Sequence, residues 1–107
     1  MEATDRAVLD HAKRSHDRIN SALDSLATYS SEDRVNKAMG AIDAALSAVR
    51  SLAPHAKVLQ IPAIENAVIG FVFARDVNSV RMQRDALADI RAIIDGWDAD
   101  LRLAMSS

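Results

Sequence analysis

Cysteine is absent from this chain of 107 residues, and aromatic residues, glycine and proline are scarce. Without cysteine the protein can form no disulfide framework, no thiolate zinc site and no cysteine nucleophile. Aromatic side chains make up 4% of the sequence, and there are three glycines and two prolines. Twenty alanines supply much of the 50% apolar content, and this composition favours helices over sheets.

The chain also lacks an excess of positive charge, a signal peptide and a long apolar run. Its formal net charge of −2 argues against a general polyanion binder, because basic charge dominates nonspecific affinity for nucleic acid. The stretch from Met1 to Asp10 lacks the basic-then-apolar order of a signal peptide. The longest apolar run, Ala67 to Ala74, has eight residues, far fewer than the roughly 20 of a membrane helix. We therefore expect one soluble, cytoplasmic helical domain over residues 1–107, with no membrane contact.

Apolar residues recur at alternating steps of three and four along most of the chain. This period predicts an all-α protein, an antiparallel bundle of three or four helices over residues 4–29, 31–53, 62–75 and 78–105. The seam of the first helix consists of Leu9, Ala12, His16, Ile19, Leu23 and Leu26. The clearest seam belongs to the last helix and consists of Val80, Leu87, Ile90, Ile94, Trp97, Leu101 and Ala104.

Serine and proline residues indicate where the middle helices begin and end. Ser30 or Ser31 can cap the second helix, and Pro54 ends it, because the residue before a proline is disfavoured in the α region. Pro62 suits the first turn of the third helix.

The boundary between the third and fourth segments leaves more than one structure open. The seams of the two segments are out of phase, which favours a break near Asp76–Ser79, with polar residues there to cap a new helix. Neither proline nor glycine occurs between Gly70 and Gly96, so one long kinked helix over residues 62–105 is the alternative. The β-branched residues within Ala67–Phe73 also permit a strand.

Small residues form a stripe on each of the two middle helices. The stripe of the second helix consists of Ala38, Ala41, Ala45 and Ala48, and that of the third consists of Ala63, Ala67, Gly70 and Ala74. Small side chains let helix backbones approach closely, so we expect the two stripes to face each other or their copies in a second chain. Leucine at Ala41 or Gly70 would then overpack the contact, at a cost of about 1–3 kcal/mol.

The third helix carries large apolar residues on nearly every side. A helix of this kind must be buried all round, and a small domain has few helices to cover it. Either this helix lies in the middle of a four-helix bundle of one chain, or a second chain covers one of its faces. We favour the second arrangement, a homo-oligomer and most simply a symmetric dimer. The expected self-interface consists of Ile64, Val68, Gly70, Phe71 and Phe73.

His16 is the one polar side chain in the middle of an apolar seam. It could act as a general base, a metal ligand or a pH switch, or be a core histidine satisfied by one partner. His11 lies about 140° around the helix from His16, which excludes a shared metal through i, i+4 spacing. No Glu-x-x-His pair, phosphate-binding glycine loop or nucleophile elbow is present. We therefore expect no catalytic residue, no metal site and no cofactor.

Charged residues of both signs share the faces of the last segment. Asp85 and Asp89 lie on one side of the predicted helix, as do Asp95 and Asp98. The arginines spaced to neutralise these carboxylates are Arg81, Arg84, Arg91 and Arg102. This arrangement is typical of a solvated helix face.

The missing catalytic motifs and the helical pattern together favour a binding protein. We expect a small non-catalytic protein-binding module of the adaptor, chaperone, immunity or phage-encoded inhibitor type, whose partner the sequence does not identify. The alternative is a nucleic-acid-associated regulator that binds through the face of Arg81, Arg84 and Arg91. An enzyme built around His16 is the third hypothesis.

Overall fold

The protein is a bundle of four antiparallel helices, the last of which is kinked. The computed structural model describes residues 3–28, 31–52 and 55–106. Its elements are α1 (Ala3–Thr28), α2 (Glu32–Arg50), the short 3-10 helix η1 (His55–Leu59), α3 (Ile61–Asp76), α4 (Val80–Asp95) and α5 (Trp97–Ser106). The expected all-α bundle is therefore confirmed. The strand that the sequence permitted within Ala67–Phe73 is wrong, because these residues belong to α3.

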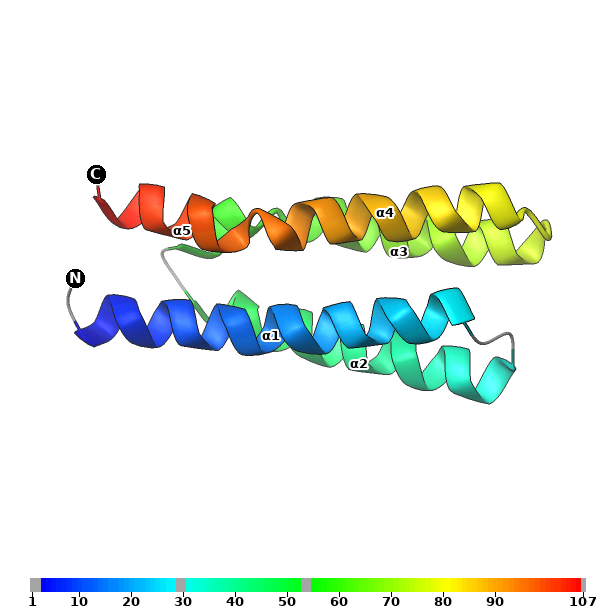
Figure 1. Ribbon diagram of the computed structural model, residues 1–107, viewed down its shortest axis with the longest axis horizontal. Helices are drawn as coiled ribbons and strands as arrows, with labels where there is room; N and C mark the ends of the chain where they lie inside the picture. Colours follow the sequence, from blue (N-terminus) through cyan, green and yellow to red (C-terminus); the bar gives the residue numbers. More distant parts are fainter. Residues whose placement is uncertain (1–2, 29–30, 53–54, 107) are drawn as a thin grey trace.

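The bundle consists of two helical hairpins packed side by side. The closest backbone approaches join α1 to α2 and α3 to α4. Between the hairpins, α1 lies against α4 and α5, while α2 contacts α3. Both hairpins turn at the end of the molecule away from the chain termini (Figure 1), and the molecule measures 47 × 21 × 18 Å. Each helix therefore has one face toward the core and one toward the outside of its own hairpin.

Local sequence signals determine several of the helix boundaries. Ser31 caps α2, and its Oγ accepts a hydrogen bond of 3.4 Å from the backbone N–H of Arg34. Pro62 lies in the first turn of α3, as expected. The expected helix ends at residues 29 and 53, and the role of Pro54, lie outside the described residues.

The turn between α3 and α4 is built by the polar residues that follow α3. Asn78 has a positive φ of 57°, a left-handed conformation that asparagine tolerates better than most residues. Its N–H donates to the carbonyl of Arg75, and the N–H of Ser79 donates to the carbonyl of Ala74 over 2.8 Å. These two bonds form a Schellman motif. Ser79 then caps α4 through the N–H of Met82. The expected break is confirmed, and the long helix over 62–105 is not formed.

Gly96 interrupts the helix expected over residues 78–105 and separates α4 from α5. Directly after the kink, Trp97 is 1% exposed, as its place in the seam predicts. Its indole Nε1 donates a buried hydrogen bond of 2.8 Å to the carbonyl of Leu59 at the end of η1. This hydrogen bond therefore links the start of α5, directly after the kink, to η1, the segment that leads into α3.

The core contains the seams of all four helices. Its largest fully buried side chains include Ile19, Leu23, Ile42, Leu46, Ile64, Phe71, Ile90 and Ile94. Val80, expected in the seam of the last helix, is exposed because it lies in the first turn of α4, at the end of the bundle. The inner faces of both hairpins thus match the sequence period, with Val80 as an exception at the tip of the second hairpin.

Candidate functional site

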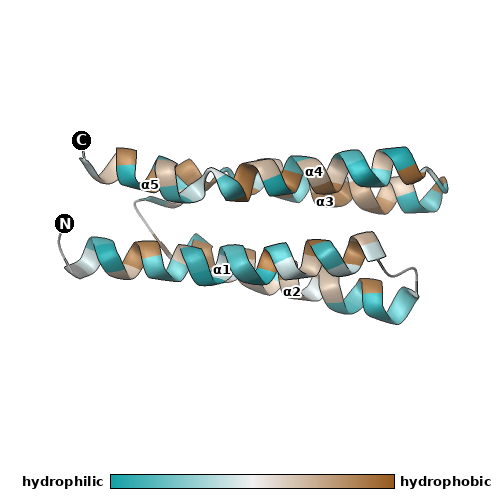
Figure 2. Ribbon diagram, viewed as in Figure 1, coloured by the Kyte–Doolittle hydropathy of each residue, from teal (hydrophilic) through white to brown (hydrophobic). Residues whose placement is uncertain are grey.

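Exposed large apolar side chains gather on one short part of the chain. Six of the seven in the described residues fall between residues 69 and 82, and the seventh is Leu103 on α5. Ile69, Val72, Phe73 and Val77 follow helical spacing along the outer side of α3, and we call them the α3 patch. Ile69 is 67% exposed and Phe73 is 55% exposed. Figure 2 shows hydrophobic residues along α3, whereas hydrophilic segments alternate along α1.

The structure divides the five residues of the expected self-interface between core and surface. Ile64 and Phe71 are buried in the core of a single chain, and Val68 packs partly against that core. Gly70 is half-buried, and Phe73 alone is well exposed. Ile64 and Phe71 offer no surface to a second chain, because α4 and the other hairpin already cover the inner side of α3.

Sequence reasoning missed Ile69, Val72 and Val77 as surface residues, although α3 as a whole was recognised as apolar all round. The signal that could have identified them is the presence of apolar residues on all sides of α3, in a domain with few other helices to cover it. It indicates surplus apolar surface, but it does not say which side of α3 the other helices leave uncovered.

The two stripes of small residues do not face each other within the chain. Ala38 and Ala41 line a groove between α1 and α2, whereas Ala63, Ala67 and Gly70 line a groove between α3 and α4. Each stripe therefore lies beside the partner helix of its own hairpin: the α2 stripe lies beside α1, and the α3 stripe lies beside α4. The larger residues that line the surface between α2 and α3 include Met39, Ile42, Leu46, Val68 and Ile69.

Within the single chain, neither Ala41 nor Gly70 lies at a close helix contact. A Cβ atom added at Gly70 would meet no atom within 4 Å. Ala41 is exposed at the edge of its groove. A Cβ atom therefore fits at Gly70 in the single chain, and the cost of leucine at Ala41 or Gly70 stays a prediction for a contact between chains.

The two grooves carry opposite charges on their rims. The α1/α2 groove has a volume of about 670 Å³ and is lined by Arg18, Arg34 and Lys37, together with alanine and serine and no acidic residue. The α3/α4 groove has a volume of about 710 Å³ and is lined by Asp85 and Asp89 without a basic residue. Each groove can therefore attract a partner of the opposite charge.

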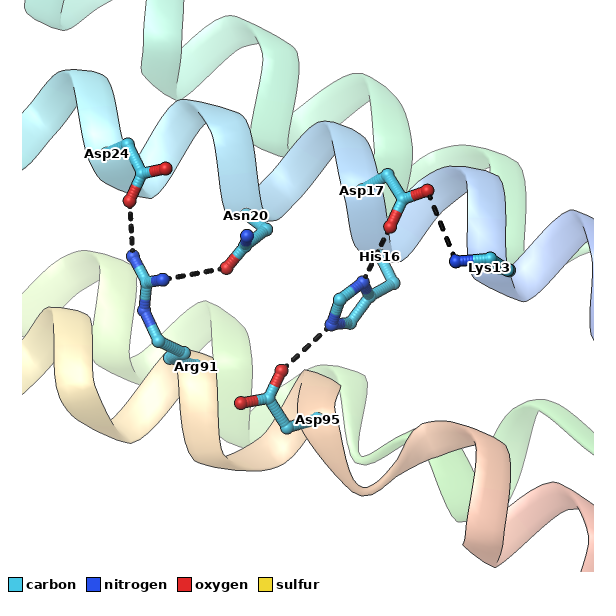
Figure 3. Close-up of polar contacts among 7 residues, drawn as sticks. All are labelled: Lys13, His16, Asp17, Asn20, Asp24, Arg91 and Asp95. Atoms are coloured by element: carbon cyan, nitrogen blue, oxygen red, sulfur yellow. Dashed lines mark hydrogen bonds and ion pairs between the residues drawn. The ribbon is translucent and has the colours of Figure 1, made fainter.

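A polar network joins α1 to α4 across the interface between the hairpins (Figure 3). His16 Nε2 lies 2.8 Å from a carboxylate oxygen of Asp95, and its Nδ1 lies 3.0 Å from Asp17. One turn along the interface, Arg91 donates to Asn20 and to Asp24, each over 2.9 Å. Both ring nitrogens of His16 are occupied by carboxylates, so the imidazole has no free nitrogen to offer to a substrate.

The pKa of His16 lies above its ordinary value of 6.5. Partial burial alone would lower it, but the hydrogen bonds that the ring donates to Asp95 and Asp17, together with the negative charges of these residues, outweigh this effect. The hydrogen bond from His16 in turn lowers the pKa of the Asp17 carboxyl. The imidazolium form therefore stabilises the contact between α1 and α4, and His16 remains a candidate for a pH-dependent contact.

A pocket of about 340 Å³ lies beside this network, between α1 and the kink. Leu9, Ala12, Ile94 and Trp97 form its apolar part, and the charged residues around it are Lys13, His16, Asp95 and Asp98. Within residues 3–28, 31–52 and 55–106, no three histidine or carboxylate side chains come together as metal ligands. The pocket therefore holds no group of residues suited to a metal ion.

The three arginines of the expected nucleic-acid face differ in their contacts. Arg91 is bound to Asn20 and Asp24 on α1, whereas Arg81 and Arg84 lie exposed on α4. Arg102 pairs with Asp98 over 2.8 Å, as its spacing indicates. Asp85 and Asp89, which arginines were expected to neutralise, form no ion pair in the part of the chain that the structure describes.

No known protein family, curated protein or solved structure matches the chain.

Proposed function

We propose that the protein is a small non-catalytic protein-binding module and that the α3 patch is its binding surface. The observation that supports this proposal is the position of the exposed large apolar residues in the described parts of the chain, all but one of which fall between residues 69 and 82. Contiguous apolar surface on a small protein typically marks an interaction site. Phe73 at its centre is an aromatic side chain of the kind that is enriched in the core of protein interfaces.

The proposal assigns no catalytic role to His16. A general base needs a ring nitrogen within reach of the proton that it removes. In this bundle, Asp17 and Asp95 occupy the two nitrogens, and the described residues bring no nucleophilic side chain onto the ring. We therefore place the module among adaptors, chaperones, immunity proteins or inhibitors, which act by contact alone.

The apolar character of α3 is assigned to protein contact and not to a membrane. By length and composition alone, the 22-residue stretch His55–Asp76 is apolar enough to cross a bilayer. However, a left-handed residue, Gln60, separates η1 from α3 within this stretch. The remaining helix of 16 residues extends about 24 Å, less than the roughly 30 Å of a hydrocarbon core. Glu65 on α3 also forms an ion pair of 2.7 Å with Arg50.

Quantitative affinity capture from cells that produce the protein tests this proposal. The test variant is Ile69→Gln with Phe73→Gln, because glutamine is polar and favours helices. The control is Leu103→Gln, which removes a similarly exposed apolar side chain outside the patch. The proposal predicts that a partner bound by the wild type is retained by the control and reduced at least about tenfold with the test variant.

Two results would contradict the proposal. One is a partner that both variants retain, since binding would then use another surface. The other is flotation of the wild-type protein with lipid vesicles, lost in the Ile69→Gln and Phe73→Gln variant, because the patch would then bind lipid. Circular dichroism of each variant establishes that the helical fold is intact.

A further inference from the structure

The two charged grooves lie on opposite faces of the molecule. Because α1 contacts α4 and α2 contacts α3, the four helices stand at the corners of a square with each hairpin along one side. The α1/α2 groove is on the outer side of the first hairpin, and the α3/α4 groove is on the outer side of the second. Figure 1 shows these hairpins as separate layers with their outer sides turned away from each other.

Two basic and two acidic residues on the rims of these grooves form no ion pair within the described residues. On the basic side, Arg18 and Lys37 form no ion pair in the described parts of the chain, and neither do Asp85 and Asp89 on the acidic side. Elsewhere on the bundle, charged side chains do pair, as Arg50 does with Glu65. Opposite charges on two surfaces of similar size attract and orient those surfaces toward each other.

The shape of the grooves permits helices to pack against them. Small side chains form both floors, Ala22 and Ala38 on one side and Ala67 and Gly70 on the other. Inside the molecule the α1/α2 hairpin already packs on the α3/α4 hairpin. A second copy placed on either outer face would repeat this hairpin-on-hairpin arrangement, and the two small-residue stripes would then meet between chains.

We propose that copies of this chain associate head to tail, with the acidic α3/α4 groove of one copy on the basic α1/α2 groove of the next. Such an interface is heterologous, because it joins two different surfaces and leaves one groove free at each end. The association therefore continues beyond a dimer unless the rotation between copies closes a ring. The α3 patch is not needed for it, so this inference does not rest on the proposed binding function.

Sedimentation velocity of the purified protein tests the association. The wild type is expected to form species larger than the 11.6 kDa monomer at about 10 mM ionic strength and to dissociate at about 1 M, where charges are screened within about 3 Å. Reversing the acidic rim with Asp85→Arg and Asp89→Arg should weaken the association about tenfold or more. The control, Asp10→Arg with Asp43→Arg, changes the net charge equally at exposed positions outside both grooves and should associate like the wild type.

A mixing experiment separates head-to-tail contact from other forms of association. The variant Arg18→Glu with Lys37→Glu has two acidic grooves, and the variant Asp85→Arg with Asp89→Arg has two basic ones. Each alone should be monomeric, whereas an equimolar mixture should associate again because opposite grooves are restored between different copies.

The proposal is overturned if the wild type is monomeric at low salt, or if the mixture of the two variants does not associate. A dimer that ignores both charge reversals but dissociates on Ile69→Gln with Phe73→Gln would also overturn it, because the α3 patch would then be the self-interface. These outcomes differ from loss of a foreign partner, which concerns the patch alone.

Discussion

The two hairpins have equivalent inner faces and different outer faces. Ile19 on α1 and Ile90 on α4 are both fully buried, and each hairpin contributes a continuous apolar seam to one core. On the outside, the described residues of α1 and α2 include no exposed large apolar side chain, whereas α3, the turn after it and the start of α4 carry six. Since folding needs only the inner faces, the extra apolar residues of the second hairpin are available for binding.

The largest effects are expected where the hairpins are alike. Replacing Ile19 or Ile90 by alanine removes a fully buried side chain and should lower the free energy of unfolding by about 2–5 kcal/mol in either hairpin. Trp97→Ala should cost about 3–5 kcal/mol, and it also leaves the carbonyl of Leu59 without its donor. Urea unfolding followed by circular dichroism measures all three. A cost below about 1 kcal/mol in one hairpin only would show that the inner faces are not equivalent.

A smaller effect of opposite sign is expected at the helical glycines, one in each hairpin. Gly40 on α2 and Gly70 on α3 both have room for a Cβ atom, with no atom within 4 Å. Neither has a positive φ, so alanine fits the backbone and should raise the free energy of unfolding by about 0.5–1 kcal/mol. Thermal unfolding of Gly40→Ala and Gly70→Ala compares the hairpins directly. A loss of stability at Gly70 would indicate a close neighbour that the single chain lacks.

The smallest effect concerns the polar contact between the hairpins. Because the pKa of His16 is raised in the folded protein, its contribution is complete below 6.5 and is lost as the pH rises through the raised value. For such a partly exposed pair the contribution should stay below about 1 kcal/mol. Urea unfolding between about pH 6 and pH 9 should show this decline in the wild type and not in His16→Gln. An identical decline in both proteins would assign it to other groups.

Sequence reasoning predicted the features that depend on neighbouring residues. The first-turn proline Pro62 and the inner seams follow from local spacing, and the structure confirms them. For the helix caps, local sequence offered several polar candidates each, and the structure selects Ser31 and Ser79 among them. The break at Gly96 was not predicted, although the glycine itself was a signal for it.

Features that depend on distant residues could not be predicted in the same way. Asp95 is 79 positions from His16, and Asp24 is 67 positions from Arg91, so neither contact leaves a trace in local spacing. The small-residue stripes were assigned to each other because spacing identifies a helix side and not its neighbour. For the same reason, the period of α3 did not reveal that Phe73 faces outward while Phe71 faces the core.

The central claim is that folding does not require the apolar side chains on the outer side of α3. The stability of the Ile69→Gln and Phe73→Gln double variant tests this claim most directly. Urea unfolding should give a free energy within about 0.5 kcal/mol of the wild-type value, as for other surface substitutions. A loss of about 2–5 kcal/mol, similar to that of a core isoleucine, would contradict the account, because these side chains would then be part of the folded core.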